Sequence, residues 1–136
     1  MSLANTDDLG KLLLRLTVGV LMIFHGIAKL GSGVGSIEAM LALRDLPAAL
    51  AWGVYVGEVI APLLLIVGSY TRVAGLIIAA NMVFAIILAH SGHLFMLSQT
   101  GGWRLELQGF FLMGGVTIAL LGAGRFSLSG TNGKWN

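Results

Sequence analysis

Four long apolar stretches follow one another along the chain, separated by short polar or glycine-rich segments. They cover about residues 9–30, 48–70, 73–90 and 105–124. The hydrocarbon core of a bilayer is about 30 Å thick, and a helix of about 20 mostly apolar residues crosses it. The pattern therefore predicts an all-α fold, in which residues 1–136 form a single four-helix transmembrane bundle.

The segments between these stretches predict how the helices are joined. Residues 68–71 make so short a connection that only a helical hairpin closes it. The first connection contains apolar and basic residues at helical spacing behind a candidate N-cap: Ser36, then Ile37, Met40, Leu41 and Arg44. This spacing predicts a short amphipathic helix between the first and second spans, lying on the membrane surface.

The first apolar stretch also has one feature of a cleaved signal peptide, because Lys11 precedes it. Arg15 interrupts the apolar run, however, and no small-residue cleavage site follows before Lys29. We therefore expect this segment to be a membrane span.

Composition supports a membrane location and excludes several kinds of chemistry. Apolar residues make up 57% of the chain and charged residues 10%, against roughly 45–50% and about 25% in soluble proteins. The chain has no cysteine, which excludes disulfides, thiolate metal sites and iron–sulfur clusters. Its net charge of +2 comes from scattered basic residues, which argues against nucleic acid as a partner.

The distribution of Lys and Arg predicts the orientation in the membrane. An even number of spans places both termini and the second connection on one side, with five basic residues: Lys11, Arg15, Arg72, Arg125 and Lys134. Three lie on the other side: Lys29, Arg44 and Arg104. Basic residues are enriched in cytoplasmic segments, so we expect both termini in the cytoplasm.

Five ionisable side chains are expected to converge at one depth, in the outer third of the four spans: His25, Lys29, Glu58, His90 and Glu106. Each such group costs roughly 2.5–3.5 kcal/mol to insert into hydrocarbon, so it must be paired, reach the interface or serve a function. Together they form a nearly neutral set, with one lysine and two imidazoles against two carboxylates.

Other polar and small residues favour particular packing arrangements. Pro62 cannot donate a hydrogen bond to the carbonyl of Glu58, which predicts a kinked backbone there. Gly57, with Gly53 four residues before it, would permit close helix contact. Asn81 is expected to make an interhelical hydrogen bond. Arg15 lies near the inner end of its span, where its side chain can reach lipid phosphates.

Two interpretations of the ionisable cluster remain open. In one, its members pair only to hold the helices together; in the other, they form a pocket for a polar headgroup or a proton path. We expect no metal or haem, because His90 and His93 at a helix end are only a weak metal signal.

Short motifs along nearly the whole chain resemble the DoxX family of small bacterial membrane proteins. They are Arg15-Leu16, Phe24-His25-Gly26, Lys29-Leu30, Glu58, Gly68 with Thr71-Arg72, His90, Gly102-Trp103 with Glu106, and residues 122–128. Ser129 stands where the family often carries Asp. The resemblance implies a four-helix bundle in the bacterial inner membrane and an association with redox chemistry, including quinone-linked oxidoreductases and complexes with soluble redox partners. A fold-level likeness transfers architecture better than activity.

These observations lead to one main functional hypothesis. The chain is expected to be an accessory subunit of a quinone-linked oxidoreductase that has no intrinsic cofactor and binds a quinone-type or similar small amphipathic molecule near the outer face. Lys29 would stabilise a developing oxyanion, with Trp103 and Gln108 as further ligand-binding residues. Proton transfer is assigned to Glu58, Glu106, His25 and His90.

Two alternatives come from other classes of protein. The chain could be a membrane anchor or assembly scaffold for soluble partner proteins, with no chemistry of its own. A carrier or small channel would need a homo-oligomer, because four helices leave little room for a pathway and the sequence has no internal repeat.

Overall fold

The structure is a computed structural model that describes residues 3–131, 133 and 135–136. Lys134, which was counted in the orientation argument, lies outside these residues. The described residues are helical with no strand, as predicted, apart from an isolated bridge between Leu97 and Trp103. The elements are α1 (Leu3–Ser32), α2 (Gly35–Ala42), η1 (Ala48–Trp52), α3 (Gly53–Tyr55), η2 (Val56–Ile60), α4 (Ala61–Val67), α5 (Thr71–Ala89), η3 (Ser91–His93) and α6 (Glu106–Leu121).

Three segments are long and apolar enough to cross a membrane: Asn5–Ser32, Ala48–Val67 and Thr71–Ala89. The fourth stretch that was predicted to cross the membrane forms the shorter apolar helix α6, which has 16 residues and is about 24 Å long at 1.5 Å per residue, and its crossing stays a prediction. It ends earlier than predicted because the next residue, Gly122, has a φ of +78° and a non-helical conformation.

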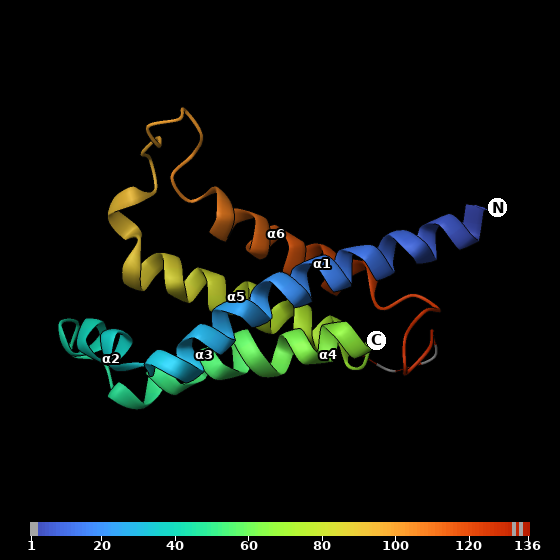
Figure 1. The fold of residues 1–136 in the computed structure, drawn as a ribbon, viewed down its shortest axis with the longest axis horizontal. Coiled ribbons are helices and arrows are strands. Elements are labelled where there is room, and N and C mark those ends of the chain that lie inside the picture. Colours follow the sequence, from blue (N-terminus) through green and yellow to red (C-terminus); the bar gives the residue numbers. More distant parts are fainter. Residues whose placement is uncertain (1–2, 132, 134) are drawn as a thin grey trace.

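The helices lie lengthwise beside one another (Figure 1). Both termini are at one end, while α2 and the long loop that connects α5 to α6 are at the other. The backbones of α5 and α6 approach so closely that a Cβ added at Gly75 would lie 2.6 Å from the carbonyl oxygen of Gly115. Glycine on both helices is what permits this contact.

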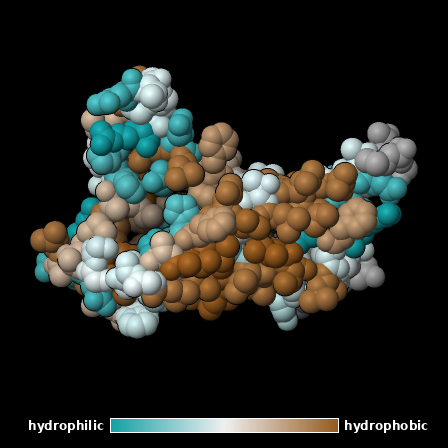
Figure 2. Space-filling view, viewed as in Figure 1, coloured by the Kyte–Doolittle hydropathy of each residue, from teal (hydrophilic) through white to brown (hydrophobic). Residues whose placement is uncertain are grey.

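The surface confirms the membrane character of the chain. Large apolar side chains are exposed along the helices, including Phe24, Leu76, Phe110 and Leu120. Hydrophobic residues form a broad band over the middle of the molecule, and hydrophilic residues gather at its two ends (Figure 2). With three helices of spanning length, the chain is a multi-pass membrane protein.

The predicted helix in the first connection is present as α2. Leu41 is fully buried and packs with Val34, Ala51 and Leu88, so α2 is attached to the end of the bundle. Its position on the membrane surface stays a prediction.

Toward the end of the molecule that holds both termini, two arginines donate hydrogen bonds to backbone carbonyls. Arg15 is 1% exposed and donates hydrogen bonds of 2.6 Å to the carbonyls of Leu65 and Phe126. Arg72 donates to the carbonyls of Ala119 and Leu120, each at 2.7 Å, at the C-terminus of α6. The expectation that Arg15 reaches lipid phosphates is therefore wrong, because protein carbonyls surround its guanidinium group.

Candidate functional site

The candidate site is built around an ion pair between α1 and η2. Nζ of Lys29 lies 2.6 Å from Oε2 of Glu58. The Glu58 side chain is 6% exposed and the Lys29 side chain 28%. The carboxylate is therefore buried, whereas the ammonium group retains access to the surroundings.

Two further polar groups support this pair. Nδ2 of Asn81, on α5, donates to Oε1 of Glu58 at 3.4 Å. The hydroxyl of Tyr55 donates to the backbone carbonyl of Lys29 at 3.1 Å. The expected interhelical hydrogen bond of Asn81 is confirmed, and it links a third helical segment to the ion pair.

The local sequence explains why the Glu58 carboxylate can face this site. Pro62 removes the donor that an α-helix would supply to the Glu58 carbonyl, and Val56–Ile60 forms a π-helical turn. The backbone thus departs from α-helical hydrogen bonding where a kink was predicted, and the kink itself stays a prediction. Gly26 of α1 lies against the same carbonyl so closely that an added Cβ would collide with it. Of the two glycines expected to permit close contact, Gly57 contacts Asn81, whereas a Cβ at Gly53 would meet nothing within 4 Å.

A cavity of about 160 Å³ lies beside the ion pair. Its polar lining residues come from α1, η2, α6 and the end of α5: His25, Lys29, Glu58, Gln108 and His90. Apolar side chains complete the wall: Met22, Met82, Ala85, Leu107 and Phe111. A cavity of about 150 Å³ can hold one benzene molecule, so the space suits a single six-membered ring.

The two histidines of this cavity are held by contacts with α6. The ring of His25 packs edge-on against Phe111, with centroids 5.7 Å apart and an interplanar angle of 88°. Nε2 of His90 lies 3.3 Å from Nε2 of Gln108. The amide can donate to this ring nitrogen when the nitrogen carries no proton.

A second cavity, of about 230 Å³, shares Lys29, Glu58 and His90 with the first. It also includes Asn81 of α5 and Ile37 of α2. The ion pair therefore forms part of the wall of both cavities.

Four of the five ionisable residues predicted to converge are brought together: His25, Lys29, Glu58 and His90. Glu106 is not. Its side chain is exposed and turns back over the loop, where Oε2 would lie 2.7 Å from a Cβ at Gly102. It lines neither cavity, so its predicted place in the cluster is corrected.

The two other predicted ligand-binding residues have different outcomes in the structure. Gln108 lines the first cavity. Trp103 does not, because its Nε1 donates to the carbonyl of Leu94 at 2.8 Å and its ring lies against Gly109. Asn81 and Tyr55 were not expected in the cluster. The signal for Asn81 was its position as an isolated amide within an apolar helix, whereas Tyr55 carried no such signal.

The part of the chain that contains the ion pair also matches a known protein family. The family model named DoxX matches residues 10–91, more than half of the sequence. The chain belongs to the DoxX family. This match includes every residue of the ion pair and its supports, whereas Gln108 and Phe111 lie beyond it.

One protein that this chain resembles has a functional name. The chain is 31% identical over 80 residues to the protein named "Putative oxidoreductase CatD" of Bacillus subtilis (strain 168). The alignment covers 59% of this chain and 59% of that relative. No solved structure matches the chain.

The chemistry available to this DoxX protein follows from its paired charges. The Lys29 ammonium has three N–H donors, of which Glu58 accepts one, so two can bind an oxygen of a guest molecule. Glu58 and the two imidazoles can exchange protons with such a guest. In the part of the chain that the structure describes, no three His, Asp or Glu residues form a group able to hold a metal ion.

Proposed function

We propose that this DoxX protein binds a small amphipathic molecule of quinone type in the cavity beside Lys29 and Glu58. The observation that carries the proposal is a buried ion pair in the wall of a cavity sized for one ring. A pair that served packing alone would need no adjoining space, whereas this pair borders two cavities. Lys29 would donate to a carbonyl oxygen of the ring, and the amide of Gln108 is a further hydrogen-bonding group in the lining of the same cavity.

Proton exchange is the chemical role that these side chains support. Reduction of a quinone to a quinol takes up two electrons and two protons. Glu58, His25 and His90 would supply or accept the protons, since all three line the cavity. A soluble partner that carries its own flavin or dithiol would supply the electrons. The relative's name as an oxidoreductase is in keeping with this role.

We further propose that the chain crosses the bacterial inner membrane four times, with α6 as the fourth span. Both termini lie at one end of the molecule, as an even number of crossings requires (Figure 1). The excess of basic residues at that end supports a cytoplasmic location for both termini. The Lys29–Glu58 site would then lie toward the outer face, with α2 on the membrane surface.

Equilibrium binding of a water-soluble benzoquinone to the purified protein in nanodiscs tests the binding proposal. We expect saturable binding to the wild type and a loss of at least about tenfold in affinity for Glu58→Gln, which removes the ion pair. Glu106→Gln is the matched control because Glu106 lines neither cavity, and it should bind as the wild type does. Equal affinity of Glu58→Gln and the wild type would reject the site.

A second candidate function, a membrane scaffold, is favoured by the loop between α5 and α6. This loop extends away from the helices (Figure 1) and exposes Phe95 almost completely and Leu97 by 68%. Such side chains on a projecting loop can anchor a protein partner. Cross-linking from Phe95 that recovers a partner, with recovery unchanged in Glu58→Gln, would support the scaffold over the binding site.

A further inference from the structure

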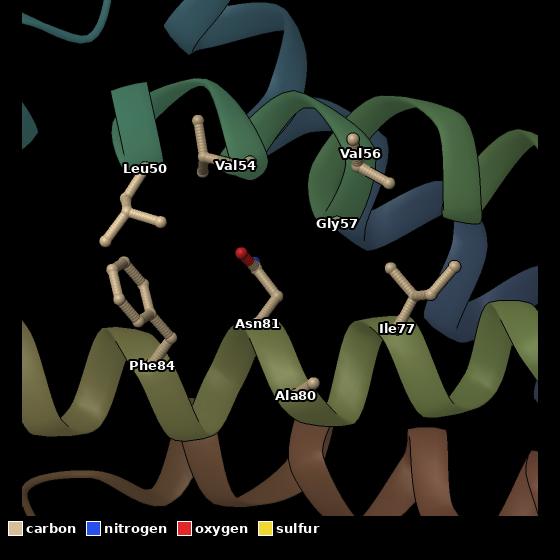
Figure 3. A pocket seen from close by; sticks show the side chains of 9 residues that line it. Leu50, Val54, Val56, Gly57, Ile77, Ala80, Asn81 and Phe84 are labelled. Atoms are coloured by element: carbon tan, nitrogen blue, oxygen red, sulfur yellow. The ribbon is translucent and has the colours of Figure 1, made fainter. Parts of the chain in front are cut away.

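An open apolar groove lies beside the cavities that the ion pair borders. It lies between the segment η1–α3–η2 and helix α5, and has a volume of about 390 Å³ (Figure 3). Its walls are apolar side chains and glycine, including Leu50, Val54, Ala80 and Phe84. Asn81 is the single residue with a polar side chain in its lining, and it projects from α5 toward the opposite helix.

The groove adjoins the second cavity, and the second cavity adjoins the first, because each pair has lining residues in common. The groove and the second cavity share Val54, Asn81 and Phe84. The second cavity and the first share Lys29 and Glu58. The neighbouring spaces therefore change from apolar to charged around the Asn81–Glu58 hydrogen bond.

We propose that this groove holds the apolar tail of a lipid-soluble ligand whose headgroup lies at the Lys29–Glu58 pair. The inference rests on the proposed function and extends it to the ligand class: a headgroup with a prenyl or alkyl chain, which enters from the bilayer. The polarity of these spaces fits such a molecule, because the apolar groove is open at the side of the molecule, whereas the Glu58 carboxylate is buried. A water-soluble ring would have no use for a groove that carries one amide along its length.

The side chains of the groove offer variants that block it without touching the ion pair. Ala80 is exposed in the groove wall, so Ala80→Phe would occupy the space of the tail. Gly53→Leu would narrow the groove from its opposite wall. A Cβ added at Gly53 meets nothing within 4 Å. Two variants on different helices guard against one that fails to fold. Ala28→Phe is the matched control, because Ala28 is exposed on α1 and lines neither the groove nor the two cavities.

The experiment compares two probes in nanodiscs, a tailless benzoquinone and the same ring with a decyl chain. Affinities are expressed as mole fractions in the bilayer, because the tail gains packing contacts rather than release from water when it leaves lipid. We expect Ala80→Phe and Gly53→Leu to weaken binding of the decyl compound by about five- to tenfold, and to leave the tailless ring unchanged. Ala28→Phe should change neither.

Each outcome decides between the two proposals. If the tailless ring binds with dependence on Glu58 but neither groove variant affects the decyl compound, the tail groove is rejected and the headgroup site remains. If both probes lose affinity equally in the groove variants, the groove is also rejected, because the effect does not depend on the tail. Absence of saturable binding of either probe to the wild type rejects the proposed function itself. A phospholipid retained in native mass spectra and lost in Ala80→Phe, with decyl-quinone binding unaffected, would assign the groove to membrane lipid.

Discussion

Gly26 of α1 lies directly against the backbone carbonyl of Glu58, and three residues later the same helix supplies Lys29, which pairs with the Glu58 carboxylate. Residues three apart share one face of a helix. One face of α1 therefore provides both the space that admits η2 and the charge that neutralises its acid. The close approach of two backbones and the ion pair are parts of one contact.

Gly26→Ala should destabilise the protein because its Cβ would meet the Glu58 carbonyl and the side chain of Val59. Overpacking of this kind costs about 1–3 kcal/mol. Gly10→Ala on the same helix is the control, since a Cβ there meets nothing within 4 Å, and it should be neutral or stabilising by up to about 1 kcal/mol. Reversible unfolding in mixed micelles measures both. Equal stability of the two variants would mean that α1 and η2 are not packed so closely.

A double-mutant cycle on Lys29 and Glu58 measures their coupling. Lys29→Met leaves a buried carboxylate unpaired, so it should destabilise the protein more than the double variant Lys29→Met/Glu58→Leu does. We expect a coupling free energy of about 1–3 kcal/mol from the same unfolding measurement. A coupling near zero would show that the pair contributes no interaction in the membrane.

Arg15 provides an independent test of the fold. Arg15→Met removes two hydrogen bonds to carbonyls, one of which holds the segment after α6 to the bundle. Bonds from a charged donor contribute about 1.5–3 kcal/mol each, so the variant should be clearly less stable and its segment 122–131 more readily cleaved by protease. Lys11→Met removes an i,i+4 pair with an exposed aspartate and should have little effect. Similar proteolysis in both variants would contradict the role assigned to Arg15.

The absence of cysteine makes the topology directly testable. Ser69 and Ser129 are joined by a hydroxyl hydrogen bond of 3.1 Å, so single cysteines at these positions should label from the same side of the membrane. Cysteines at Asp45 and Thr100 should label from the other side. Labelling of Thr100→Cys and Ser129→Cys from one side would show that α6 does not cross.

Three helices of spanning length lie close to the stretches predicted from the sequence, because lipid imposes a simple requirement on length and polarity. The sequence also placed His25, Lys29, Glu58 and His90 at one depth, since depth follows from counting residues along a helix. The prediction that Glu106 joins this cluster was wrong. It is the first residue of α6, where the preceding loop offers its side chain a position over Gly102, outside the bundle.

Contacts that depend on the direction of a side chain across helices were harder to predict. Asn81 was correctly expected to bond to another helix, but its partner depends on how the π-helical turn presents Glu58. Arg15 was wrongly assigned to lipid phosphates. After Gly122 the chain returns and brings the Phe126 carbonyl to Arg15, but no hydrophobic pattern in the sequence indicates this return. The depth of a side chain along the bundle follows from the sequence of its own helix, whereas the direction in which it points depends on how several helices pack together.

Photoaffinity labelling with an azido-benzoquinone tests the central claim most directly, because it reports where the ring binds. The chain has no thiol to react with the quinone non-specifically, and adducts can be mapped by peptide mass spectrometry. We expect adducts on the residues around the Lys29–Glu58 cavity, in particular His25, Gln108 and Phe111, and we expect these adducts to disappear with excess unlabelled quinone and in Glu58→Gln. Adducts confined to the exposed loop around Phe95, or cavity adducts that persist in Glu58→Gln, would contradict it.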